Sequence, residues 1–232
     1  MTASCYQNGE YLARHPRWHE EDASWKSAQV CRMLERNRMT PSTFCEVGCG
    51  AGGVLADLQR RQGPSARFWG YEVSPQAYEI CRSKENERLR FVLGDVIEEP
   101  PTRTYDVVML LDVVEHIEDH MEFLRRVRPL GRAKIFHFPL DLSVQSLLRG
   151  VPSRVRETAG HIHYFTRELA LMTLRDTGYE VVDYFYTPAA LETGTPGLGT
   201  RLLKLPRKLM FSINPNGAAL CLGGFSLLIL AV

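Results

Sequence analysis

A chain of 232 residues is long enough to bury one large core, and 44% hydrophobic with 24% charged residues is typical of an ordinary globular protein. A formal net charge of +1 argues against a polyanion as the main partner, because binding to a phosphate backbone needs concentrated Lys and Arg. Six cysteines without a CxxC pair indicate neither a zinc knuckle nor a disulfide scaffold. They are typical of a reducing compartment, so we expect a cytoplasmic protein.

Neither end of the chain has the pattern of an export signal or a membrane span. Residues 1–22 lack the apolar core of a signal peptide. The apolar residues 218–232 are fewer than the roughly 20 that a span needs and are broken by two glycines, so they predict a turn that feeds a buried strand. We interpret the basic clusters at 125–128 and 201–208 as solvated faces, and we do not expect nucleic acid as a partner.

In chain order, residues 1–40 have a helical, aromatic pattern and are interpreted as an N-terminal cap, whose last helix is expected to cross the carboxyl edge of a sheet. A main domain then spans 41–232, where β-type apolar runs alternate with amphipathic stretches, as in a parallel sheet covered by helices on both faces. The predicted strands are 43–47, 67–73, 89–93, 105–111, 133–138, 180–186 and 225–231. The predicted helices are 53–61, 75–85, 121–128 and 166–177.

Two further segments, 139–165 and 187–223, interrupt this alternation near the ends of the fifth and sixth strands. Ligands of open α/β sheets bind outside the carboxyl ends of the strands. We therefore predict that both insertions are lids that choose the substrate.

The stretch "FCEVGCGAGGVLADL" places four glycines directly after the first strand, where the backbone can approach a ligand and a helix N-terminus faces it. Gly48, Gly50 and Gly53 also match the dinucleotide pattern G-x-G-x-x-G. Glu46 decides between ligands, because a carboxylate beside the loop repels a pyrophosphate but suits a cation. S-adenosylmethionine carries a sulfonium, an ammonium group and no phosphate.

With these residues the chain resembles the class I S-adenosylmethionine-dependent methyltransferases, whose first motif, E/D-x-G-x-G-x-G, is met by Glu46, Gly48, Gly50 and Gly52. "YEVSP", "GDV" and "YDVVMLLDVVEHIED" follow in the family's order. The resemblance implies a doubly wound, Rossmann-like sheet of seven strands in the order 3-2-1-4-5-7-6, with the last strand antiparallel.

The resemblance also implies the roles of several residues in binding S-adenosylmethionine. Glu72, with Val73 beside it, would hold the ribose hydroxyls, and Asp95 with the amide of Val96 would read the adenine. Leu111 and Asp112, at the end of the fourth strand, would lie beside the methionine moiety of the cofactor.

Histidines at the same edge are the predicted acceptor-side residues. A hydroxyl acceptor benefits from a general base with a pKa near neutrality, which histidine provides. We predict His116 and His161 as catalytic residues, with Asp112 beside them. His137 and Asp141 at the fifth strand, and Trp25 and Lys26 near the N-terminus, fit either ligand contact or packing.

"DVVEH" also resembles the E-x-x-E-H motif of two metal-dependent branches, the ubiquinone-pathway O-methyltransferases and the small-RNA 3'-terminal 2'-O-methyltransferases. When the metal ligands of those branches are carried over to this chain, they correspond to Asp112, Glu115, His116 and, for the RNA branch, His161. Such a set could hold a divalent ion that orients acceptor oxygens. The first position is Asp where the motif has Glu, which shortens its reach.

The sequence therefore predicts a methyltransferase that acts on a small molecule, at a hydroxyl oxygen. The alternatives are methylation of nitrogen or carbon, RNA 2'-O-methylation, a non-catalytic S-adenosylmethionine-binding subunit and a nicotinamide dehydrogenase. The acceptor and the oligomeric state do not follow from these patterns.

Overall fold

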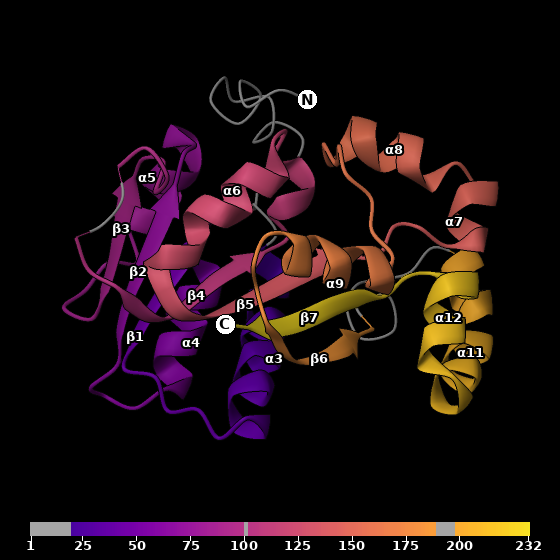
Figure 1. Ribbon diagram of the computed structural model, residues 1–232, viewed down its shortest axis with the longest axis horizontal. Coiled ribbons are helices and arrows are strands. Elements are labelled where there is room, and N and C mark those ends of the chain that lie inside the picture. Colours follow the sequence, from indigo (N-terminus) through magenta and orange to yellow (C-terminus); the bar gives the residue numbers. More distant parts are fainter. Residues whose placement is uncertain (1–19, 100–101, 189–197) are drawn as a thin grey trace.

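The computed structural model of the chain describes residues 20–99, 102–188 and 198–232, built on one seven-stranded sheet in the order β3-β2-β1-β4-β5-β7-β6 (Figure 1). The strands are β1 Thr43–Val47, β2 Arg67–Glu72, β3 Leu89–Leu93, β4 Tyr105–Leu111, β5 Gly131–Pro139, β6 Val181–Thr187 and β7 Ser226–Ala231. β1 to β5 pair in parallel, and β7 runs antiparallel between β5 and β6. The expected fold class, strand order and antiparallel last strand are confirmed.

The sheet has a separate apolar core on each face, because successive side chains of a strand point to opposite sides. In β4, Val107 and Met109 join one core, and Val108 and Leu110 join the other. The first core packs α3 Ala23–Arg36, α4 Gly53–Arg61 and α5 Pro75–Arg82 against the sheet. The second packs α6 His120–Val127 and α9 Arg167–Asp176. Helices on both faces hold the parallel strands in register. The carboxyl ends of these strands therefore share one edge of the sheet.

The helices form where the sequence places them, and their first turns are capped. Ser74 begins α5 by accepting a hydrogen bond from the N–H of Ala77, and Thr166 begins α9 through the N–H of Leu169. The helix predicted over 75–85 is wrong at its end, because α5 stops at Arg82. The N–H groups of Lys84 and Glu85 donate to carbonyls three residues back, so the chain already turns there toward β3.

α3 differs from the expected helix across the carboxyl edge. Val30, Met33 and Leu34 share one side of the helix and are buried on the sheet face beside α4. Only the first turn, with Trp25 and Lys26, reaches the ligand edge. The short helix η1 Glu20–Asp22 precedes it. Residues 1–19 of the predicted cap lie outside the described part of the chain.

The described residues of the two insertions supply four helices at one end of the molecule, and residues 189–197 of the second insertion lie outside the described part of the chain (Figure 1). The first holds α7 Val144–Leu148 and α8 Val151–Thr158, and the second holds α11 Leu198–Ile213 and α12 Pro215–Leu222. α12 packs against both α7 and α11, so the insertions support each other. Their role as lids stays a prediction. Within the described ranges, no helix has the length and apolarity needed to cross a membrane.

Candidate active site

A cavity of about 420 Å³ opens at the carboxyl ends of β1, β2, β4 and β5. This volume lies in the range of sites for ligands of drug size, about 300–1,000 Å³. Of the residues predicted to bind the cofactor, the wall contains Glu46, Gly48, Gly50, Glu72, Val73, Leu111 and Asp112. Gly52, Asp95 and Val96 do not line it. Asp95 is exposed and accepts a hydrogen bond from the N–H of Ile97, and its adenine role stays a prediction.

The glycine loop has a backbone that other residues would not adopt easily. Gly48 has a φ of +69°, and a Cβ there would lie 2.9 Å from a methyl carbon of Val113. Gly52 has a φ of +74°, and a Cβ there would meet the ring of Phe91 at 2.5 Å. The N–H groups of Gly48 and Cys49 both donate to the carbonyl of Tyr71. Gly48 therefore shapes the cavity wall, and Gly52 lets α4 begin close to the sheet.

Glu72 connects the end of β2 to this loop. One carboxylate oxygen accepts from the N–H of Gly50 at 2.7 Å, and the other accepts from the N–H of Ser74 at 2.8 Å. Burial raises the pKa of Glu72, and the backbone hydrogen bonds oppose that shift. Each carboxylate oxygen can accept a second bond, so Glu72 remains able to bind hydroxyl groups.

Glu46 lies in the floor of the cavity and is 3% exposed. Its Oε2 atom has no hydrogen-bond partner among the described residues. Burial raises the pKa of Glu46 to about 8, against the charge of Lys26, which lowers it. A buried carboxyl without a partner is costly. A ligand with positive charge would relieve that cost, so the site fits S-adenosylmethionine.

Asp112 is the centre of a chain of polar contacts between α3 and β5. It lies 2.7 Å from Nζ of Lys26 and 2.6 Å from Nδ1 of His137, whose Nε2 is 2.8 Å from Oγ1 of Thr187. Burial alone would raise the pKa of Asp112, but His137 and Lys26 hold it well below its usual range. Asp112 therefore carries a negative charge in the cavity wall.

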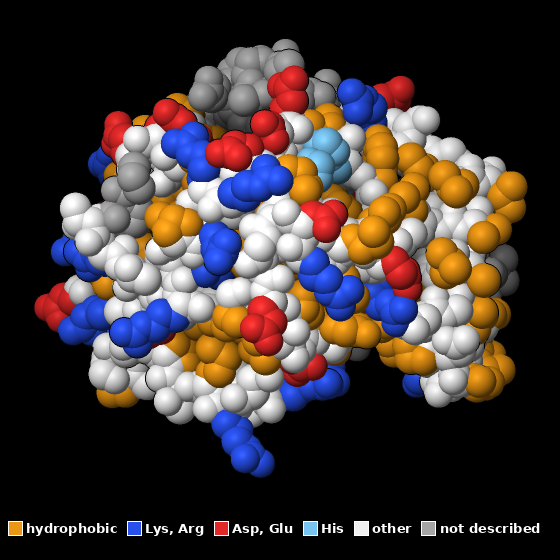
Figure 2. Space-filling model, viewed as in Figure 1, with side chains coloured by type: hydrophobic (Ala, Val, Ile, Leu, Met, Phe, Trp, Pro, Cys, Tyr) orange, Lys and Arg blue, Asp and Glu red, His pale blue; other side chains and the backbone are white. Residues whose placement is uncertain are grey.

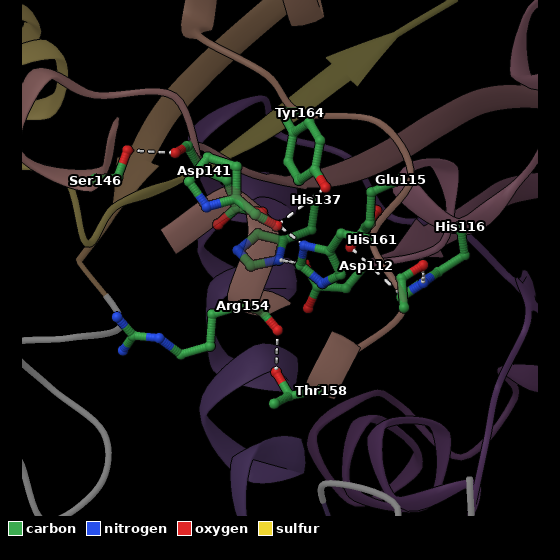
Figure 3. A network of polar contacts seen from close by, with 12 residues as sticks. Asp112, Glu115, His116, His137, Asp141, Ser146, Arg154, Thr158, His161 and Tyr164 are labelled. Atoms are coloured by element: carbon green, nitrogen blue, oxygen red, sulfur yellow. Dashed lines mark hydrogen bonds and ion pairs between the residues drawn. The ribbon is translucent and has the colours of Figure 1, made fainter. Parts of the chain in front are cut away.

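A carboxyl and two imidazoles also meet in the cavity wall (Figure 3). One ligand atom each from Glu115, His116 and His161 lies within 4.8 Å of the others. The structure thus brings together three of the four predicted metal ligands. Asp112 is outside this group, paired with Lys26 and His137.

Glu115 is fully buried in the turn η2 Val114–His116, and neither carboxyl oxygen has a hydrogen-bond partner in the described ranges. Burial, followed by the charge of Asp112, raises its pKa well above the usual range. His116 lies beside it, with Nδ1 3.2 Å from the carbonyl of Gly160. Burial and nearby His161 lower the pKa of His116 to about 4, so its imidazole is neutral at pH 7.

His161 is held by Asp141, with Nδ1 2.5 Å from Oδ2 of the carboxylate (Figure 3). The carbonyl of Asp141 in turn accepts from the hydroxyl of Ser146 at 2.5 Å, at the capped start of α7. A carboxylate only accepts hydrogen bonds, so Nδ1 of His161 is assigned the proton. The free electron pair is then on Nε2.

Three further residues belong to the site, namely Lys26, His137 and Asp141. The sequence alone had left the role of each open between ligand contact and packing. For His137 and Asp141 the available signal was their position at the end of the fifth strand. Lys26 offered no comparable signal, because its partners Asp112 and Glu46 are distant in sequence.

Comparison with known proteins agrees with this geometry. A model of the family described as methyltransferase domain matches residues 18–184. Mitochondrial ubiquinone biosynthesis O-methyltransferase of Schizosaccharomyces pombe is 32% identical over 108 residues, which cover 42% of this chain and 38% of that protein. Ajmaline N-methyltransferase of Rauvolfia serpentina is 28% identical over 120 residues, covering 46% and 40%. The chain thus matches less than half the length of these two relatives.

Among solved structures, magnesium protoporphyrin IX methyltransferase of Synechocystis PCC 6803, with bound SAH, superposes with a TM-score of 0.60. The alignment covers 90% of this chain and 82% of that one at 16% identity, which is a likeness of fold. The family match spans well over half of the sequence and includes the glycine loop and the acids around it. The chain therefore belongs to the class I S-adenosylmethionine-dependent methyltransferases.

Proposed function

We propose that this protein transfers a methyl group from S-adenosylmethionine to a hydroxyl oxygen of a small-molecule acceptor. The observation that carries the proposal is one cavity with two chemically different sides. Glu46 and the glycine loop form a side suited to a cation, and His161, held by Asp141, forms a side suited to accept a proton. S-adenosylmethionine, when bound, supplies an electrophilic methyl group on a sulfonium.

The charges of the first side match those of the donor. Glu46, Glu72 and Asp112 are three acids in the wall, and Lys26 is an ammonium group beside them. S-adenosylmethionine has a sulfonium and an ammonium group as cations, and one carboxylate. The acids favour the cationic groups, and Lys26 favours the carboxylate.

The second side suits a hydroxyl group better than an amine. An amine attacks through its own lone pair once it is unprotonated, whereas a hydroxyl must lose its proton during the reaction. His161 has an electron pair on Nε2 for that proton, and Ile117, Pro139 and Ala159 give an apolar wall around it. Because methyl transfer is an in-line displacement, these walls would act chiefly by positioning the acceptor.

The test is turnover of purified protein with S-adenosylmethionine and a panel of small phenols, alcohols and amines, followed by release of S-adenosylhomocysteine. We expect methylation of a hydroxyl compound. Methylation restricted to amines would contradict the oxygen assignment. Calorimetry with S-adenosylmethionine separates the remaining alternative, because binding of this donor without turnover on any acceptor would indicate a non-catalytic subunit.

We further propose, as an alternative to His161 acting as the base, that Glu115, His116 and His161 hold a divalent ion. The supporting observation is the carboxyl of Glu115, whose two oxygens lack partners within the described ranges although they are buried. Carboxylate and imidazole groups suit such ions, and an ion there would lower the pKa of an acceptor hydroxyl. Chelation should then abolish turnover, with recovery on addition of magnesium, manganese or zinc. Full activity after chelation would contradict it.

A further inference from the structure

The outer side of α11 exposes a line of aliphatic side chains. Leu205 and Ile213 are each 77% exposed and Leu209 is 65% exposed. They are spaced by four residues, so they lie along one side of the helix. Single exposed hydrophobic residues are normal on a protein surface, but a continuous group marks a site of interaction.

The fold does not need this line of residues, because the other side of α11 already anchors the helix. Phe211 stacks on Phe225 with ring centroids 4.9 Å apart, and Met210 packs against the core. Arg207 is 5% exposed and donates to the carbonyl of Leu222 and the side chain of Gln145. α11 is thus apolar on two sides, and among the described residues only one of these sides contacts protein.

The neighbouring helix α7, which contacts the anchored side of α11, exposes aliphatic residues of its own. The contact of Arg207 with Gln145 joins α11 to α7. α7 exposes three aliphatic residues, which are Val144 at 54%, Leu147 at 59% and Leu148 at 84%. Figure 2 shows hydrophobic side chains along the right-hand side of the molecule, where Figure 1 places α7, α11 and α12.

The charge of the segments around this surface is mostly positive. Residues 142–158 and 198–232, which contain α7, α8, α11 and α12, hold seven basic residues and one acidic residue. Their net charge of +6 contrasts with +1 for the whole chain, so the remainder of the protein is acidic. Lys208, beside Leu209, is among the exposed basic residues.

We propose that the aliphatic line of α11 docks this protein onto an anionic lipid bilayer. A helix with an aliphatic side and only basic charges lies in the plane of a membrane interface, with its apolar residues among the upper acyl chains. The basic residues around it are attracted to acidic headgroups. A surface that binds another protein would instead be expected to contain aromatic residues and charges of both signs.

Flotation of the full chain with vesicles tests this proposal. We expect the protein to float with vesicles of phosphatidylglycerol and phosphatidylcholine, to bind phosphatidylcholine vesicles much less, and to dissociate in high salt. The triple variant Leu205→Ser, Leu209→Ser and Ile213→Ser should reduce vesicle binding by at least about tenfold. All three positions are exposed, so the variant should unfold at the same temperature as the original protein.

The matched control is Leu169→Ser, Met172→Ser and Val182→Ser, three residues exposed by 43%, 53% and 51% away from α7 and α11. This control should float like the original protein. Equal flotation of both variants, or no flotation of the original protein at low salt, would overturn the proposal. The proposal would also be overturned if light scattering showed a dimer that the α11 variant abolishes, while the original protein does not bind vesicles. That result would assign the surface to a second copy of this chain.

Discussion

At the scale of single residues, Glu46 has the most direct consequence for binding. Its pKa is raised to about 8 by burial, whereas a glutamate in an unfolded chain has a pKa of about 4.3. The folded protein therefore holds this proton more tightly than the unfolded chain does. The corresponding contribution to stability is present at low pH and is lost as the pH rises from about 4 to 8.

We predict from this shift that donor binding releases a proton at pH 7. A cationic ligand favours the ionised form of Glu46 and so lowers its pKa below that of the free protein. Calorimetry in two buffers with different ionisation enthalpies measures the released proton. Glu46→Gln is the control and should bind without that release. An identical release from the variant would assign the proton to another group.

Asp141 should control turnover through His161. Asp141→Asn removes the negative charge that fixes Nδ1 of His161 and replaces one carboxylate oxygen by an NH2 group, so it should lower turnover by roughly tenfold to a hundredfold, with donor affinity nearly unchanged. Asp176→Asn, an exposed carboxyl at the end of α9, is the matched control and should be as active as the original protein. Loss of donor affinity with unchanged turnover would show that Asp141 acts on the other side of the cavity.

Residues of the donor side were predictable from the sequence, because their signals are local. Glu46, Gly48 and Glu72 lie at fixed places at the ends of strands, and the structure puts all three in the cavity wall. The partners of Asp112 and His161 were not predictable in this way. Lys26 meets Asp112, and Asp141 meets His161, only because the folded sheet brings separate segments to one edge.

At the scale of elements, α3 shows how one helix serves both the core and the site. Its apolar residues are buried on the sheet, and its first turn carries Lys26 to Asp112. The helix is evident in the sequence from its apolar period, but the face that it covers is not. That face is set by the space that α4 leaves on the sheet.

The packing of α3 should make a large contribution to stability. Met33 is fully buried, and Met33→Ala should lower the free energy of unfolding by about 2–5 kcal/mol, because it removes apolar contacts and leaves a cavity. Glu35→Ala, at an exposed position of the same helix, should change it by less than about 0.5 kcal/mol. Urea unfolding measures both. Equal effects would mean that α3 is not packed as described.

At the scale of the whole molecule, the sheet depends on its last strand. All six residues of β7 are buried, and the strand pairs with β5 on one side and β6 on the other. Within the described residues β6 has no other strand beside it, so β7 joins it to the sheet. Alternation of strands and helices predicted most of this architecture, and the family resemblance supplied the place of β7. The α11 and α12 helices were not predicted, because their pattern fits no part of that alternation.

Deletion of residues 226–232 should therefore abolish cooperative unfolding. The loss of β7 exposes the apolar faces of β5 and β6 together and separates β6 from the sheet. Thermal unfolding followed by circular dichroism measures the transition. Deletion of Val232 alone, which is exposed, should leave it cooperative. A sharp transition after the longer deletion would contradict the central role of β7.

The place of β7 also governs how a nascent chain reaches its native state. While the ribosome is still making α11 and α12, β5 has an open edge and β6 has no neighbour to pair with. The sheet closes only after β7 has left the exit tunnel, so the unfinished polypeptide presents unpaired strand edges to other chains while residues 140–225 are made. Chaperones that bind such strands would have their longest opportunity on this protein between the emergence of β5 and that of β7.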